Sequence, residues 1–140
     1  MDADERGCPF EETTEAVIEA AFRVSNALGV GYLERVYENA LAHECRKAGL
    51  SVQQQVRLVV RYDGIVVGEY TLDLLIDDDV VLELKHAKSL SDAHPAQTLK
   101  YLRASGKQLA LLINFGTARV QVKRVVNGLS REQTSAIICG

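Results

Sequence analysis

The chain has 140 residues, with 16 basic and 19 acidic side chains and a net charge of −3 at neutral pH. Hydrophobic residues make up 47% and charged residues 25%, which excludes a largely disordered chain and is typical of a globular protein. This length suits one unit, so we expect residues 1–140 to form a single domain with its core at about 14–127. The chain shows no membrane span or secretion signal, and its three cysteines lack Cys-x-x-Cys spacing, so we expect a cytoplasmic protein without a membrane partner.

Two helices are predicted in the first third of the chain. Residues 14–28 repeat apolar side chains at helical spacing, with Thr13 or Thr14 able to cap the start and Gly29 able to end the helix. A second helix is expected at about 33–48, with Gly49 as its stop.

The middle of the chain predicts strands. Residues 54–62 alternate apolar and polar side chains, Asp63-Gly64 is typical of a two-residue hairpin turn, and residues 65–69 return. The strand that carries Asp73 either continues this return strand or bends away from it, and the strand that carries Glu83 follows a polar turn of three aspartates.

The last part of the chain predicts one helix between strands. The helix opens at Ser91 or Asp92 and runs through Ala104. Strands are expected at 109–114 and 120–126, and a short helix from Ser130. This order favours an α/β fold in which helices flank a mixed β-sheet.

Asp73, Glu83 and Lys85 are charged residues inside apolar strands, where an uncompensated charge is costly. Glu83 and Lys85 project from the same face of one strand, and a hairpin would bring Asp73 toward Glu83. Two carboxylates beside one ammonium can hold Mg²⁺ and serve an attacking water, which indicates phosphodiester hydrolysis. The same three residues could instead form only an internal ion pair.

The charges are unevenly distributed along the chain. Residues 1–80 carry 7 basic and 16 acidic side chains, whereas residues 81–140 carry 9 and 3. The basic half begins beside the candidate site, so it either forms a phosphate-attracting face or is a scatter of solvated charges. The residues of this basic half that could form such a face are Lys85, Lys88, Lys100, Arg103, Lys107, Arg119, Lys123 and Arg124.

The segment from Gly31 to Tyr37 resembles the signature of the GxxExxY family, a group of small proteins in the PD-(D/E)XK nuclease superfamily. The resemblance covers roughly residues 14–127. It continues through separated motifs in the right order: Glu38-Asn39-Ala40-Leu41, Gln55, Tyr62, Gly68-Glu69-Tyr70, Asp73-Leu74-Leu75, Glu83-Leu84-Lys85, His94, Ala96-Gln97, Tyr101-Leu102 and Leu111 to Phe115. It implies a restriction-endonuclease-like core.

The resemblance also implies roles for individual residues. Asp73, Glu83 and the carbonyl of Leu84 would hold Mg²⁺ or Mn²⁺, and Lys85 would serve the attacking water. A helical acid commonly completes such a site; Glu34, the acid of the signature, matches best, with Glu38 and Glu44 as alternatives. Gln97 matches a polar position that often faces the site.

Nucleic acid, DNA more than RNA, is the expected partner. Lys88 and Lys100 are expected to contact it, and Tyr101 is either a substrate contact or a core residue whose hydroxyl has a partner. The alternative function is a catalytically inactive nuclease fold that binds nucleic acid or a protein. Homodimerisation or a larger complex stays open, as do sequence preference and pathway.

Overall fold

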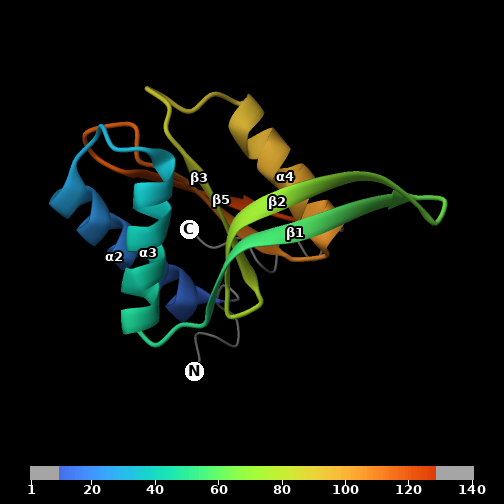
Figure 1. Ribbon diagram of the computed structural model, residues 1–140, viewed down its shortest axis with the longest axis horizontal. Helices are drawn as coiled ribbons and strands as arrows, with labels where there is room; N and C mark the ends of the chain where they lie inside the picture. The colour runs from blue at the N-terminus through green and yellow to red at the C-terminus, as the bar shows by residue number, and fades with distance from the viewer. Residues whose placement is uncertain (1–9, 129–140) are drawn as a thin grey trace.

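The computed structural model describes residues 10–128. It contains a five-stranded sheet with helices on both faces (Figure 1). The elements in chain order are α2 (Glu11–Leu28), α3 (Glu34–Lys47), β1 (Val52–Tyr62), β2 (Ile65–Ile76), β3 (Val80–Lys85), α4 (Ala93–Ser105), β4 (Leu109–Asn114) and β5 (Gln121–Val126). This confirms the mixed sheet and its flanking helices. The helix expected from Ser130 lies outside the described residues.

The strands follow one another across the sheet in chain order. Adjacent strands are antiparallel except β3 and β4, which are parallel and are joined by α4 as a crossover helix. The Asp63-Gly64 turn between β1 and β2 has positive φ at both residues, as the expected hairpin turn requires. Each helix in the described part of the chain is too short or too polar to cross a lipid bilayer.

Two apolar layers hold the helices against the sheet. Leu82 of β3 packs in the larger core with residues of α2 and α3, whereas Val81 packs in a smaller core with Leu102 of α4. Because side chains alternate along a strand, Glu83 and Lys85 project from the same face as Val81, under α4. The acid and base predicted from the sequence therefore face the smaller core.

The first helix begins earlier than expected. α2 starts at Glu11, so Thr14 lies inside it, and its hydroxyl donates a hydrogen bond to the carbonyl of Phe10 at 2.8 Å instead of capping the start. The physical reason is that the first-turn acids Glu11 and Glu12 favour the positive end of the helix dipole, which lets the helix start before the threonines.

The Asp73 strand continues the return strand, and the two form the single strand β2. The regular alternation of side chains in β2 is interrupted at Asp73. Leu72 packs in the smaller core with α4, whereas Leu74, two residues later, packs in the larger core with α2 and α3. Gln55 stands opposite Asp73 in β1, and its φ of 56° is left-handed. Beyond this point residues 56–72 form an arm, the β1 and β2 hairpin, which reaches away from the rest of the sheet (Figure 1).

The left-handed conformation of Gln55 predicts an unusual response to mutation. We expect Gln55→Val to lower the free energy of unfolding by about 1–2 kcal/mol more than Gln55→Gly does, because both variants lose the hydrogen bond to Glu38 but only the β-branched residue is strained at positive φ. Thermal denaturation measures both. Gln53→Val is the matched control at an exposed position of the same strand, and it is expected to be neutral or stabilising. Equal changes in the free energy of unfolding for Gln53→Val and Gln55→Val would contradict backbone strain at position 55.

Candidate active site

The site lies where β2 and β3 separate. Their paired residues end at Leu74 and Leu82, so Asp73 and Glu83 stand at the fork between the strands. The backbone N–H of Leu84 donates to Oδ2 of Asp73 at 2.8 Å, a side-chain bond at the point where strand pairing stops. The hairpin predicted from the sequence is thus present, and it brings the two acids together.

Burial raises the pKa of both acids. Glu83 is only 4% exposed, and burial followed by the charge of Asp73 raises its pKa to about 8, although Lys85 opposes the shift. Burial also raises the pKa of Asp73; the hydrogen bond from Leu84 opposes this, and the charge of Glu38 adds to it. The two carboxyl groups are close enough to share one proton. At neutral pH this pair needs either that proton or a cation.

One oxygen of the pair is left without a partner. Oε2 of Glu83 is buried and accepts no hydrogen bond from the described residues. A buried acceptor without a partner is costly, and a hard divalent cation would satisfy it together with Asp73. These donors therefore fit Mg²⁺ or Mn²⁺. Within residues 10–128, however, no three His, Cys, Asp or Glu side chains gather closely enough to form a ready-made metal cluster.

The third acid near the fork is Glu38, and glutamine side chains engage both of its oxygens. Nε2 of Gln54 donates to Oε2 at 2.8 Å, and Nε2 of Gln55 donates to Oε1 at 2.7 Å. Arg35 adds an ion pair at 3.5 Å. Glu38 is buried, and its charge acts on Asp73, so it is the acid of α3 that belongs to this region.

The structure does not bring Glu34, the favoured helical acid, to the pair. α3 begins at Glu34, whose side chain is exposed at the first turn, whereas Glu38 lies one turn later on the face toward β1. Glu44 instead forms ion pairs with Arg23 at 3.3 Å and with Lys47 at 3.6 Å.

Lys85 lies beside the acids and forms a hydrogen bond with a residue of α4. Its Nζ donates to Oε1 of Gln97 at 3.3 Å, and its charge acts on both Asp73 and Glu83. Gln97 is the position that was expected to face the site, and the structure brings it to the lysine. It can hold the ammonium between the acids and α4.

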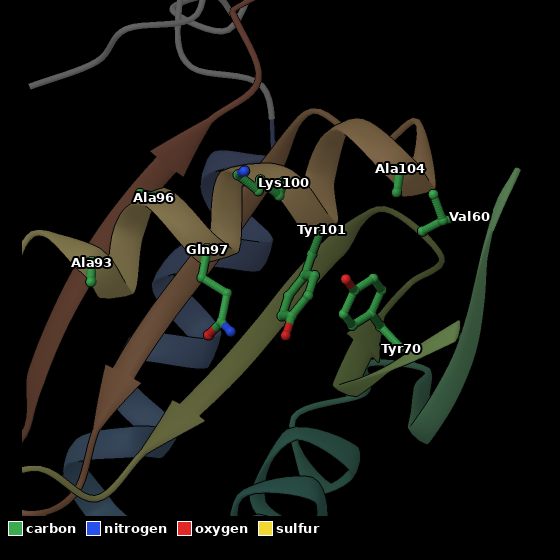
Figure 2. A pocket seen from close by; sticks show the side chains of 8 residues that line it. All are labelled: Val60, Tyr70, Ala93, Ala96, Gln97, Lys100, Tyr101 and Ala104. Carbon is green, nitrogen blue, oxygen red and sulfur yellow. The ribbon is translucent and has the colours of Figure 1, made fainter. Parts of the chain in front are cut away.

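The three expected substrate contacts are placed differently from one another. Tyr101 is half-buried, and its pKa is raised by burial and then by the charge of Glu83. Lys100 lines a cavity beside α4 together with Gln97 and Tyr101, but its side chain points away from theirs (Figure 2). Lys88 is exposed in the bend after β3.

The basic residues of the second half do not all gather at the site. Lys107 donates to the carbonyl of Asp78 at 2.8 Å and pairs with its carboxylate at 3.7 Å. Asp78 belongs to the turn between β2 and β3, which lies at the other end of those strands from the fork. Lys107 therefore does not belong to a group of cations at the acid pair.

The sequence alone indicates no role at the site for Gln54, Gln55 and Tyr70. The two glutamines orient Glu38, and Tyr70 contacts Tyr101 with ring centroids 5.2 Å apart. A signal was available for the glutamines, because three consecutive glutamines, Gln53 to Gln55, are unusual in a strand that otherwise packs apolar residues. For Tyr70 the contact depends on α4 and could not be read locally.

The family model described as the PD-(D/E)XK nuclease superfamily matches residues 11–125. The chain belongs to this superfamily. Asp73, Glu83 and Lys85 lie within the matched region, and PD-(D/E)XK nucleases typically use divalent metal ions. No curated protein matches the sequence significantly.

A solved structure supports the fold of this PD-(D/E)XK protein. The crystal structure of SSO0001 matches with a TM-score of 0.53 and 15% identity, over 91% of this chain and 63% of that one. The present chain thus spans less than two thirds of SSO0001. An alkaline exonuclease (LHK-Exo) from Laribacter hongkongensis matches with a TM-score of 0.45 and 11% identity, over 89% of this chain and 86% of that one. The latter similarity is too low to carry a functional argument.

Proposed function

We propose that this protein is a nuclease that hydrolyses phosphodiester bonds of DNA with a divalent cation, Mg²⁺ or Mn²⁺, between Asp73 and Glu83. The observation that carries the proposal is the buried acid pair, in which Oε2 of Glu83 has no partner among the described residues and Lys85 lies alongside. The Gly31 to Tyr37 signature supports a place in the GxxExxY group.

Each residue of the site has a proposed part in the reaction. Asp73 and Glu83, with the carbonyl of Leu84, would hold the cation, and Glu38 adds negative charge that acts on Asp73. When bound, the cation would supply positive charge that stabilises the phosphoryl group and the leaving oxygen. Lys85 orients the attacking water and offsets charge that develops on the phosphoryl group, while Gln97 positions its ammonium. Water adds to phosphorus as the bond from phosphorus to the leaving oxygen breaks. The attacking water gives its proton to solvent water, and the leaving oxygen takes a proton from solvent.

Calorimetry and a cleavage assay together test this function. Wild-type protein is titrated with Mg²⁺ and Mn²⁺ and incubated with single-stranded DNA, duplex DNA and RNA. We expect one cation site and cleavage of DNA, and we expect Asp73→Asn to weaken cation binding by at least about 10-fold and to abolish cleavage, because the buried pair loses one charge.

The matched control is Asp63→Asn, which makes the same change in the exposed turn at the tip of the arm and is expected to behave as wild type. Unchanged cation affinity in Asp73→Asn, or equal trace cleavage by wild type and Asp73→Asn, would refute the proposal that the protein is a nuclease. Nucleic-acid binding without cation binding would favour the inactive binding module.

A further inference from the structure

A cavity of about 610 Å³ lies between α4 and the arm (Figure 2). The two acids and Lys85 are not among the residues that line it. The arm contributes Val60 and Tyr70, and α4 contributes Gln97 and Tyr101. Its volume is within the range of small-ligand sites. The cavity therefore has room for one flat group of the size of a nucleobase.

The cavity exists because of the small side chains of α4. Ala93, Ala96 and Ala104 are spaced along the helix face that points toward the arm, where larger side chains would close the space. The opposite wall is the arm, which leaves the body of the sheet at the bend beside Gln55. An open space is thus maintained from both sides.

The walls have the chemistry of a base-stacking site. Tyr70 and Tyr101 meet with ring centroids 5.2 Å apart and planes inclined at 48°, which leaves no room for a base between them. Tyr70 is 48% exposed, so one face of its ring stays available. A nucleobase can stack on that face, because every base has an apolar π-surface.

The cavity adjoins the candidate active site through Gln97. Gln97 lines it and also binds Lys85 at 3.3 Å. Tyr101 lines it and lies close enough to Glu83 and Asp73 for their charges to raise its pKa. Figure 2 shows the side chains of Gln97 and Tyr101 descending from α4 toward the space that Tyr70 faces. A base held here would belong to a nucleotide close to the bond that is cleaved.

We infer that this cavity binds one unpaired nucleobase of the strand being cut, by stacking on Tyr70, so that the protein acts on single-stranded or frayed DNA in preference to intact duplex. Within a duplex the base faces are covered by their neighbours and cannot reach a side pocket without unstacking. The inference rests on the proposed function for its substrate, and its geometry rests on Tyr70, Tyr101 and the open face of α4.

Binding of a fluorescent oligonucleotide tests the inference without cleavage. A single strand that contains 2-aminopurine is titrated in EDTA, with quenching as the measure of stacking and anisotropy as the measure of affinity. We expect quenching, and we expect Tyr70→Ala to weaken binding about 5- to 100-fold, with Tyr70→Phe close to wild type. Replacing one base by an abasic site should reproduce the loss at a single position of the strand.

Three further variants distinguish binding in the cavity from binding elsewhere on the surface. Ala96→Phe fills the cavity and should weaken single-strand binding as Tyr70→Ala does, whereas Ala27→Phe adds the same bulk to an exposed site on α2 and should have no effect. Tyr62→Ala removes a tyrosine that is 75% exposed on the same arm but does not line the cavity. Equal losses from Tyr62→Ala and Tyr70→Ala, or no loss from Ala96→Phe, would overturn the inference.

The binding and cleavage experiments fail independently. If Asp73→Asn leaves cleavage unchanged while Tyr70→Ala still abolishes quenching, the nuclease proposal falls and the base site stands. If cleavage depends on Asp73 but blunt duplex and single strand are bound equally by wild type and Tyr70→Ala, the base site falls and the nuclease stands.

Discussion

Lys85→Met is expected to lower the rate of DNA cleavage at saturating substrate by about 10²–10⁴-fold, because in the proposed mechanism Lys85 offsets charge on the phosphoryl group and orients the attacking water. Methionine keeps the length and apolar stem of lysine, so the fold should be unaffected. Loss of an interaction made mainly in the transition state lowers kcat more than it raises KM. Single-turnover cleavage and DNA anisotropy measure the two effects separately.

Lys47→Met is the matched control for this experiment. Lys47 is exposed at the end of α3 and pairs with Glu44, so its replacement makes the same change in net charge away from the acids. It should cleave DNA as wild type does. A rate loss of similar size in both variants would mean that net charge, and not the position of Lys85 beside Gln97, determines activity.

Glu83→Gln is expected to stabilise the metal-free protein at alkaline pH. The pKa of Glu83 is about 8 in the folded protein and 4.5 in a model compound, so folding favours the protonated acid. Wild-type stability should therefore fall as pH rises from about 4.5 to 8, whereas that of Glu83→Gln should not fall for this reason. Above that window the variant should be more stable by on the order of 2–4 kcal/mol, since each pKa unit is worth about 1.4 kcal/mol.

Thermal denaturation in EDTA across this pH range, repeated with Mg²⁺, measures the effect. Mg²⁺ should raise the Tm of wild type, because a ligand that binds only the folded state stabilises it, and it should raise that of Glu83→Gln much less. Glu19→Gln, an exposed change on α2, should follow the wild-type profile. Parallel pH profiles for wild type and Glu83→Gln would contradict a buried, repelling acid pair.

The acid pair and the lysine could be predicted because they depend on short-range rules. The alternation of strand residues places Glu83 and Lys85 on one face, and the aspartate turn at residues 77–79 makes a hairpin the shortest connection to Asp73. The order of strands and helices was also predictable, because each element carries its own apolar period and its own stop, such as Gly29 and Gly49. The register of β2 and β3 confirmed the hairpin.

The choice between the acids of α3 was a different problem. Glu34, Glu38 and Glu44 lie on one helix, and the rotation of that helix against β1 together with its position along its axis decides which acid meets Gln54 and Gln55. That rotation is set by the packing of Tyr37 and Leu41 in the core, which sums contacts from several distant strands. A local pattern contains none of those contacts.

By itself the sequence therefore determined the fold class, the order of its elements, and the pairing of Asp73 and Glu83 beside Lys85. Only the tertiary structure decided that Glu38 stands behind the pair, that β1 bends at Gln55, and that Tyr70 meets Tyr101 across an open cavity. The physical reason is range: strand alternation and turns act between neighbours in the chain, whereas helix rotation, a bend in paired strands and the space left between them follow from contacts among residues far apart in sequence.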